Sequence, residues 1–258
     1  QKPLCPSCKH GNPKAKTIQG EERFIRIQGS PDLTSEDLLG DIDPVKALKY
    51  GPGSMEAFTP GKIFLANNGV LFFDELNRCP EKLQNALLQV LEEKKATLGS
   101  YKIDIDADFI FVGTLNPQDT STEQLSDVFL DRFDVVYMSY PEDNATEEKI
   151  VTENGKKLMA FSPQLLELIV AFVRMLRESK KISKAPSVRA TIGLYERSQS
   201  NAMLNGRDHV TLEDVKDVLI SVLAHRIELK PSVKYALSPE QFVAEEAESF
   251  LKEKGGYR

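Results

Sequence analysis

The sequence predicts a three-layer α/β domain with a mainly parallel sheet, followed by an α-helical domain. Short apolar runs over 69–73 and 109–115 are typical of strands that are buried on both faces of a parallel sheet. A helical pattern lies between them, and alternating strands and helices favour a sheet with helices on both faces. Beyond residue 158 every strong pattern has helical period. We therefore predict an α/β domain over 1–158 and a helical domain over 159–258.

Local patterns predict the elements of the first domain one by one. Apolar and polar residues alternate in RFIRIQGS, as in a half-buried strand. Glycines and prolines in KYGPGSMEAFTPGK indicate a structured loop, and leucines at helical spacing follow Pro80. In chain order the patterns predict a strand over 23–30, a short helix within 30–48, a loop over 49–62, a strand over 69–73, a helix over 80–95, a hairpin over 96–106 and strands over 109–115 and 134–141.

The composition excludes several classes of protein. A net charge of -6 argues against an indiscriminate nucleic-acid or membrane-surface binder. The longest apolar run, 168–173, is far shorter than a bilayer span. Three cysteines do not make a disulfide framework. We therefore expect a cytoplasmic protein with neither a membrane nor a nucleic acid as partner.

Two adjacent acids, Asp74 and Glu75, follow the apolar run Val-Leu-Phe-Phe. In open α/β sheets the ligand crevice lies outside the carboxyl ends of the strands. A strand-end Asp suits Mg²⁺ beside substrate phosphates, and the adjacent Glu can act as a general base toward water. Asn116, which follows the next buried strand, can orient that water without adding charge. The alternative is that the two acids only cap the helix that follows.

The stretch GVLFFDELNR resembles a Walker B motif of the AAA+ ATPases, in the branch of MoxR and the magnesium-chelatase I subunit. Five segments resemble this branch in the family's order and cover nearly the whole chain. They are RIQGSPDLTSEDLLG, FTPGKIFLANNGVLFFDELN, GTLNP (similar to sensor 1), LSDVFLDRF (similar to the arginine-finger segment) and SVRATIGLYERSQSNAMLNGRDHVTLEDVKDVLISVLAHRI (similar to the sensor 2 helix and lid). The resemblance implies a P-loop NTPase-type AAA+ core followed by a helical lid.

The resemblance also implies roles for single residues in a site for ATP and Mg²⁺. Asp74 would hold Mg²⁺, Glu75 would activate the attacking water, and Asn116 would position that water. Arg132 would act in trans on the nucleotide of a neighbouring subunit. Arg189 would contact the phosphates in cis or in trans and couple the angle of the lid to the nucleotide.

Simpler roles stay open for both arginines. Arg132 could form a plain surface ion pair with Asp131 or Asp134, and Arg189 could be a solvated residue at the start of a helix. For two residues that follow the acids we expect packing or interface roles first: Asn77 and Arg78.

Two further segments resemble family insertions, 44–66 and 96–108. In the family such elements face the central channel of a ring, where they would touch a remodelled partner. The alternative is that both are surface loops.

Three residues near the start of the chain could form half of a zinc site: Cys5, Cys8 and His10. A closed structural site needs four ligands, and Cys79 lies far along the chain. The alternative is an exposed loop with reactive thiols. Packing or surface positions are expected for the other histidines, His209 and His225.

A phosphate-binding P-loop, G-x-x-x-x-G-K-[ST], does not occur in the sequence. The stretches over 11–16 and 51–62 lack the required spacing. We expect a fragment, or an ordered remainder, of a longer ATPase whose P-loop precedes Gln1, so that this chain alone is inactive. The alternative is a degenerate subunit that keeps only the second half of the site.

The function predicted for the full-length protein is that of an ATPase of MoxR or magnesium-chelatase type. It would form a ring, most simply a hexamer, and remodel or activate a client protein, with metal insertion as one form of this work. In this branch clients often carry a von Willebrand A-type domain. The competing prediction is a non-hydrolysing, ring-forming scaffold subunit with a degenerate nucleotide site.

Overall fold

The computed structural model describes residues 17–98, 103–116 and 125–254. Two compact units divide the chain between Val136 and Tyr137. Each unit has its own hydrophobic core, and each is described by itself.

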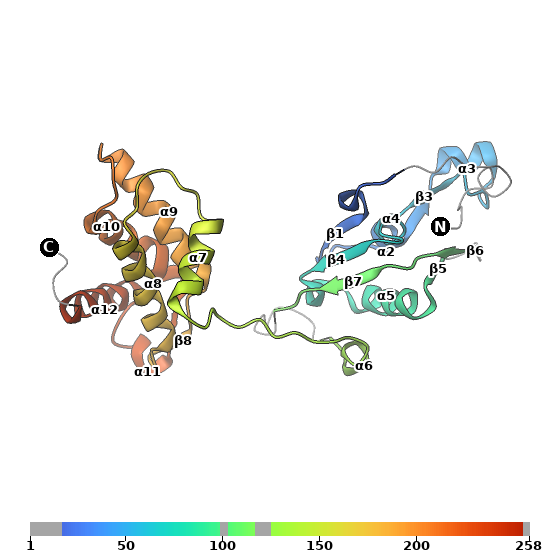
Figure 1. The fold of residues 1–258 in the computed structure, drawn as a ribbon. Helices are drawn as coiled ribbons and strands as arrows, with labels where there is room; N and C mark the ends of the chain where they lie inside the picture. Colours follow the sequence, from blue (N-terminus) through green and yellow to red (C-terminus); the bar gives the residue numbers. More distant parts are fainter. Residues whose placement is uncertain (1–16, 99–102, 117–124, 255–258) are drawn as a thin grey trace. The chain divides into compact units, whose positions relative to one another are not determined.

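The first unit is built on a parallel sheet with the strand order β1-β4-β7 (Figure 1). The strands are β1 (Phe24–Gln28), β4 (Val70–Asp74) and β7 (Ile110–Gly113). Gln28 lies opposite Asp74, and Phe73 lies opposite Gly113, so the three strands end at the same edge of the sheet. These strands and their parallel arrangement confirm the prediction for this part of the chain.

One hydrophobic core joins several helices of this unit to the sheet. They are α2 (Ser35–Leu39), α4 (Lys62–Leu65), η2 (Leu76–Arg78), α5 (Glu81–Glu93) and α6 (Asp127–Leu130). A short helix without buried residues, η1 (Gly20–Arg23), precedes β1. Leu38 of α2, Ile63 of α4 and Leu87 of α5 pack in the same cluster as Leu71 and Phe73 of β4. The predicted leucine-rich helix is confirmed as α5, which buries its leucines in this core.

Two antiparallel strand pairs also belong to the first unit. β2 (Gly40–Ile42) pairs with β3 (Phe58–Pro60), and α3 (Pro44–Tyr50) lies between them in the chain. β5 (Lys95–Leu98) pairs with β6 (Ile103–Asp106) and confirms the predicted hairpin. The turn of this hairpin, 99–102, lies outside the described residues.

β7 forms one edge of the described sheet, with β4 as its neighbour. The predicted burial of this strand on both faces is wrong, because its apolar residues Ile110 and Val112 are 67% and 44% exposed. Residues 134–141, predicted as a third buried strand, form no strand, and Val136 and Met138 are exposed. That prediction is wrong because an apolar pattern alone does not make a strand. Its backbone groups need a neighbouring strand for pairing, and no described strand pairs with this segment.

The second unit is mainly helical. Its helices are α7 (Asn144–Asn154), α8 (Pro163–Glu178), α9 (Val188–Leu204), α10 (Leu212–Leu223), η4 (Ala224–Arg226), α11 (Pro231–Lys234) and α12 (Pro239–Glu253). α8, α9 and α10 confirm the predicted helical patterns. A short strand pair, β8 (Ile182–Lys184) with β9 (Glu228–Leu229), was not predicted. No helix of the described residues combines the length and the apolar character that a membrane span requires.

The compact units and the predicted domains divide the chain at different residues. α7 belongs to the second unit because Val151 lies in the core of that unit. Residues 137–158 are therefore grouped with the helical unit by their contacts. The domain division at 158 and 159 stays a prediction, because compact units and family domains need not share their bounds.

Candidate active site

Asp74 and Glu75 lie at the carboxyl edge of the sheet, where ligands bind in open α/β folds. Asp74 is the last residue of β4, and Glu75 has a left-handed backbone with φ 53° and ψ 49°. This conformation costs a residue with a side chain about 1 kcal/mol or more. Such residues persist where the surrounding structure imposes the conformation, and they cluster at active sites.

Thr114 and Gly29 fix the backbone of Glu75 from two sides. The Glu75 N–H donates to Thr114 Oγ1 at 3.0 Å, and the N–H of Leu76 donates to the Thr114 carbonyl at 2.9 Å. Gly29 passes so close that a Cβ there would lie 2.1 Å from the Glu75 carbonyl oxygen. Gly29 also donates its N–H to the Asp74 carbonyl at 2.7 Å. Residues that directly follow the two neighbouring strands, β1 and β7, therefore hold the turn that carries Glu75.

The two carboxylate oxygens of Asp74 have different partners. Thr114 Oγ1 donates to Oδ1 at 2.6 Å, and Arg26 Nη2 donates to Oδ2 at 2.5 Å. The Thr114 hydroxyl, followed by Arg26, holds the pKa of Asp74 below its ordinary value. Asp74 is therefore an anion at neutral pH, as a ligand of a divalent cation must be.

The carboxylate of Glu75 is held at one of its oxygens. Gln28 Nε2 donates to Oε2 at 2.8 Å, and Arg78 Nη1 lies 3.2 Å from the same oxygen. The side chain of Glu75 is 40% exposed, and Oε1 has no hydrogen-bond partner among the described residues. A fixed carboxylate with one oxygen open to water has the arrangement that a general base requires.

One strand, β1, supplies a partner for each acid. Arg26 and Gln28 are two residues apart, so both side chains lie on the same face of β1. They pair in register with Phe72 and Asp74 of β4. The Arg26 guanidinium also lies 5.9 Å from the centre of the Phe72 ring. Arg26 thus holds Asp74, while Gln28 holds the following Glu.

Asn116 lies near the segment that follows the two acids. It comes three residues after the end of β7 and is exposed. Its backbone carbonyl accepts a hydrogen bond from Asn77 Nδ2 at 3.3 Å, and Asn77 is buried two residues after Glu75. The structure therefore brings Asn116 to the same edge of the sheet as the acids. Its predicted role toward water stays a prediction.

Arg132 forms an ion pair within the chain, but with a different acid from the two that the sequence suggested. It follows α6, pairs with Glu92 of α5 and donates to the Val128 carbonyl. The partners considered from the sequence were Asp131 and Asp134, which lie beside it in the chain. The guanidinium is partly exposed, so a further anion can reach it.

Arg189 is the second residue of α9 and is exposed. No ion pair of the described residues includes it. Ser187, the N-cap of α9, makes no side-chain capping bond. The start of α9 thus carries a positive side chain and backbone N–H groups, both of which favour anions.

Other residues singled out from the sequence do not join this site. The predicted half zinc site, Cys5, Cys8 and His10, lies outside the described residues. Cys79 is buried in the core of the first unit. Among the described residues, no group of three or more His, Cys, Asp or Glu side chains could hold a metal ion. Two histidines are exposed, in agreement with the expected surface positions: His209 and His225.

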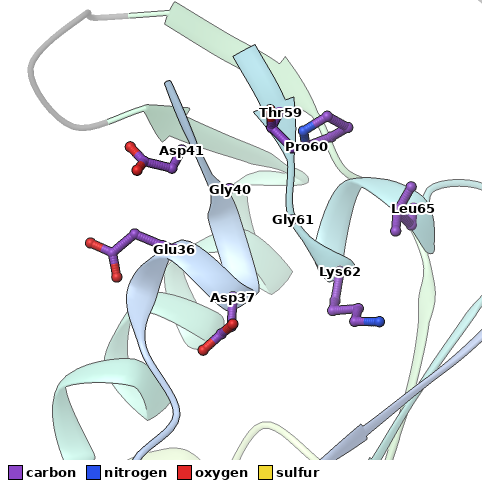
Figure 2. A pocket seen from close by; sticks show the side chains of 9 residues that line it. All are labelled: Glu36, Asp37, Gly40, Asp41, Thr59, Pro60, Gly61, Lys62 and Leu65. Carbon is purple, nitrogen blue, oxygen red and sulfur yellow. The ribbon is translucent and has the colours of Figure 1, made fainter. Parts of the chain in front are cut away.

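A pocket of about 320 Å³ is lined by residues of α2, β2, β3 and α4 (Figure 2). Its lining includes the acids Glu36, Asp37 and Asp41 but none of the predicted site residues. Asp37 forms a capping box with Thr34 at the start of α2. Hydrogen bonds from the backbone and then the side chain of Thr34 hold the pKa of Asp37 below its ordinary value. Helix capping therefore accounts for this acid.

Comparisons with known proteins support the family suggested by the sequence. Residues 12–135 match the ATPase family associated with various cellular activities (AAA), and residues 176–246 match the AAA lid domain. Chaperone MoxR1 of Mycobacterium tuberculosis is 29% identical over 80% of this chain and 61% of its own length. The magnesium-chelatase subunit ChlI homolog of Methanocaldococcus jannaschii is 27% identical over 97% of this chain and 73% of its own length.

The chain belongs to the AAA+ ATPase family. The relatives place it in the branch of MoxR and the magnesium-chelatase I subunit. A solved structure of NtrX from Brucella abortus, 17% identical, has a TM-score of 0.51 over 89% of this chain and 50% of that chain, which supports the fold alone. The predicted resemblance and fold class are thus confirmed.

AAA+ ATPases generally bind nucleotide with Mg²⁺, and the acids of this chain fit that ion. Asp74 and Glu75 offer carboxylate oxygens and Thr114 offers a hydroxyl, which are hard oxygen ligands. One or two carboxylates suffice, because Mg²⁺ keeps several waters and takes substrate phosphates as further ligands. The fit to the nucleotide is partial, since the sequence of this AAA+ chain contains no P-loop motif.

Sequence reasoning missed four residues that hold the acids in this AAA+ chain: Arg26, Gln28, Gly29 and Thr114. Thr114 lies inside GTLNP, which was singled out for Asn116. Arg26 and Gln28 are the polar positions of the alternating pattern in the first strand. Both patterns are visible in the sequence, but they indicate partners for the acids only once Gln28 is known to lie opposite Asp74.

Proposed function

We propose that this protein hydrolyses ATP with Mg²⁺ at sites shared between the subunits of a ring. The hydrolysis would drive remodelling or activation of a partner protein, in the cytoplasm. The observation that carries the proposal is the pair of acids at the end of β4. Asp74 is held on both oxygens, while the left-handed Glu75 keeps Oε1 open to water.

The two acids and Asn116 would divide the chemistry between them. Asp74 would hold Mg²⁺, directly or through water, once Arg26 shares or leaves its oxygen. Bound Mg²⁺ offsets negative charge on phosphate oxygens. Glu75 would accept the proton of the attacking water, and Asn116 would orient that water as a neutral amide.

Arg132 and Arg189 would bring positive charge to the phosphates. Arg132 would exchange Glu92 for the nucleotide of a neighbouring subunit and stabilise charge that develops during phosphoryl transfer. This role requires an assembly, and we propose a hexameric ring. Arg189 would contact phosphates from the helical unit, so that the position of this unit responds to the nucleotide.

The partner is proposed from the names of relatives. MoxR1 is named a chaperone, and the other relative reported above is named a magnesium-chelatase subunit homolog. We propose a client protein, of the kind that carries a von Willebrand A-type domain, as the target of remodelling. Metal insertion is the alternative form of this activity. The segments 44–66 and 96–108 are proposed to contact the client.

The test is an ATPase assay on the full-length protein with Glu75→Gln. We expect kcat to fall about 100-fold or more, the range for loss of a general base, while nucleotide binding is retained. Glu81→Gln is the matched control, because Glu81 is an exposed acid at the start of α5 and the change in charge is the same. Unchanged turnover in Glu75→Gln would refute the assignment of the base.

A second candidate is a non-hydrolysing ring scaffold. It is favoured by one observation, the lack of a P-loop motif in residues 1–258. In that case the full-length protein would assemble but show no turnover above background, and Glu75→Gln would change neither property. The same assay, run beside a measurement of assembly size, therefore separates the two candidates.

A further inference from the structure

A buried ion pair lies between three helices of the second unit. Glu147 of α7 is fully buried. Arg177 of α8 donates from Nη1 to Oε2 at 2.5 Å and from Nη2 to Oε1 at 2.7 Å. Thr191 of α9, also fully buried, donates its hydroxyl to Oε1 at 2.6 Å. Arg174 Nη1 lies 3.7 Å from Oε2. A buried carboxylate requires such partners, because an unpaired charge in the core is strongly unfavourable.

Arg177 extends this network to the residues just before α9. Its Nε donates to the Pro186 carbonyl at 2.8 Å, and its side chain is 6% exposed. Pro186 precedes Arg189 in the chain, and Thr191 follows it. Both sides of Arg189 are therefore tied to the same pair of buried charges, while Arg189 itself is exposed.

The same arginines hold the segment that enters the helical unit. The guanidinium of Arg177 lies 4.9 Å from the centre of the Tyr140 ring. Arg174 donates to the carbonyls of Pro141 and Glu142 at 2.8 and 2.9 Å. These three residues follow closely on the division between the two compact units.

Stability alone does not explain a buried ion pair of this kind. Replacing such a pair by well-packed apolar residues is often neutral or stabilising. The pair instead fixes the positions of separate segments relative to one another, because its directional hydrogen bonds end at particular atoms in each segment. Here the segments are the entry to the helical unit, 140–142, and the start of α9.

We propose that Glu147 and Arg177 are positioning residues that couple Arg189 to residues 140–142. The proposal rests on the proposed function, in which Arg189 contacts phosphates. It adds that the first turn of α9 and the entry segment move together, because they share these two buried partners.

The coupling follows from the order of the contacts. A phosphate that draws Arg189 toward it displaces the first turn of α9. Thr191 passes this displacement to Glu147, and Pro186 passes it to Arg177. Separating Arg177 from Glu147 is strongly unfavourable, because it would leave both buried charges unpaired. The displacement therefore reaches residues 140–142, where the chain continues toward the first unit.

The first test records the NMR signals of Tyr140 and Glu142 in the ligand-free, full-length protein, labelled at these residue types. Thr191→Val keeps the branched shape of the side chain but removes the hydroxyl that donates to Glu147. We expect the ring signals of Tyr140 and the amide signal of Glu142 to shift, because Arg177 and Arg174 contact these two residues and the buried network that holds both arginines loses a hydrogen bond. Thr191→Ser keeps the hydroxyl and should return the signals to their positions in the unchanged protein.

Thr211 offers a matched control in the same unit. Its hydroxyl donates to Asp214 Oδ2 at 2.7 Å, and Asp214 is fully buried and paired with Arg207. Thr211→Val thus removes the same kind of bond from a second buried network. It should destabilise the unit and leave the NMR signals of Tyr140 and Glu142 in place. Equal shifts of these signals in both variants would mean a general loss of stability and would overturn the proposal.

The second test adds a non-hydrolysable ATP analogue and Mg²⁺. In the unchanged protein we expect the analogue to shift the NMR signals of Tyr140 and Glu142, and in Thr191→Val most of this response should be lost. A full response in Thr191→Val would overturn the proposal. If Arg189→Ala instead keeps both the affinity and the response, the proposed role of Arg189 fails, and the ligand-free test still decides on the coupling.

Discussion

Glu75 occupies a backbone conformation that few residues with side chains adopt. In an extended strand its side chain would leave the sheet opposite to that of Asp74. The left-handed turn changes the direction of this side chain. The hydroxyl of Thr114 and the close approach of Gly29 hold the turn in place. The unfavourable conformation of one residue is therefore offset by contacts from the residues that directly follow two neighbouring strands.

At this residue scale we predict the effect of Thr114→Val. The variant removes the acceptor for the Glu75 N–H, and we expect the free energy of unfolding to fall by about 1 kcal/mol or more. It also removes the first cause of the lowered pKa of Asp74, so this pKa should rise toward its ordinary value, while Arg26 limits the change. Urea unfolding and NMR titration of the carboxyl measure the two effects.

Thr114→Ser is the control for this prediction. It keeps the hydroxyl, so the stability and the pKa of Asp74 should both stay near those of the unchanged protein. If the Val and Ser variants behave alike, the hydroxyl of Thr114 does not hold the turn at Glu75.

At the scale of elements, the start of α10 depends on a buried carboxylate. Asp214 Oδ2 accepts from the N–H and the hydroxyl of Thr211 at 2.9 and 2.7 Å. Oδ1 accepts from Arg207 and from Asn201. Burial raises the pKa of Asp214, but the bonds from Thr211 and Arg207 outweigh it, so the pKa lies below its ordinary value. This one side chain therefore joins three segments: α9, the loop that follows it, and the start of α10.

The pH dependence of stability follows from this lowered pKa. As pH falls, the unfolded chain binds the proton first, so the contribution of Asp214 is complete above about pH 4. It is lost as pH falls further, through the pKa of the folded state. We expect Asp214→Asn to lower the unfolding free energy at neutral pH by about 1 to 3 kcal/mol. Its stability should also decline less steeply below about pH 4. Denaturant unfolding at a series of pH values tests this prediction. If the stability of Asp214→Asn declines with falling pH as steeply as that of the unchanged protein, another carboxylate causes the decline.

At the scale of the whole molecule, the proposed site is divided between subunits. Arg132→Ala subunits keep Glu75, and Glu75→Gln subunits keep Arg132. Each variant alone should be inactive in the ATPase assay. Mixed rings should recover part of the activity, because some interfaces then combine an intact base with an intact arginine.

The control for this mixing experiment is a subunit that carries both changes. Mixed with Arg132→Ala subunits it should restore nothing, since no interface then has both groups. The absence of recovery at any ratio of the two single variants would count against a shared site.

Local pattern was sufficient for most of the fold. The run of β4 is apolar because its side chains contribute to the core, and α5 repeats leucine at the spacing of one helix face. The acids could be placed at the edge of the sheet because they follow that run directly. The strand predicted over 134–141 failed because a strand also needs a partner, and its own sequence does not report whether one is present.

The contacts that hold the site could not be predicted, because they join residues distant in the sequence. Arg26 and Asp74 are 48 positions apart, and Arg132 and Glu92 are 40 apart. Their meeting depends on strand register and helix packing, which no local pattern contains. The left-handed turn of Glu75 likewise depends on a neighbouring strand.

In the sheet that the described residues form, β7 is an edge strand, and this has a consequence for how residues 1–258 behave in solution. Unpaired backbone groups on an edge strand, here beside exposed Ile110 and Val112, are a template for a strand of another molecule. Prepared as an isolated polypeptide, residues 1–258 should self-associate as their concentration rises. The net charge of -6 opposes this by repulsion. Salt screens that repulsion, so precipitation should be favoured by high ionic strength and slowed in dilute buffer.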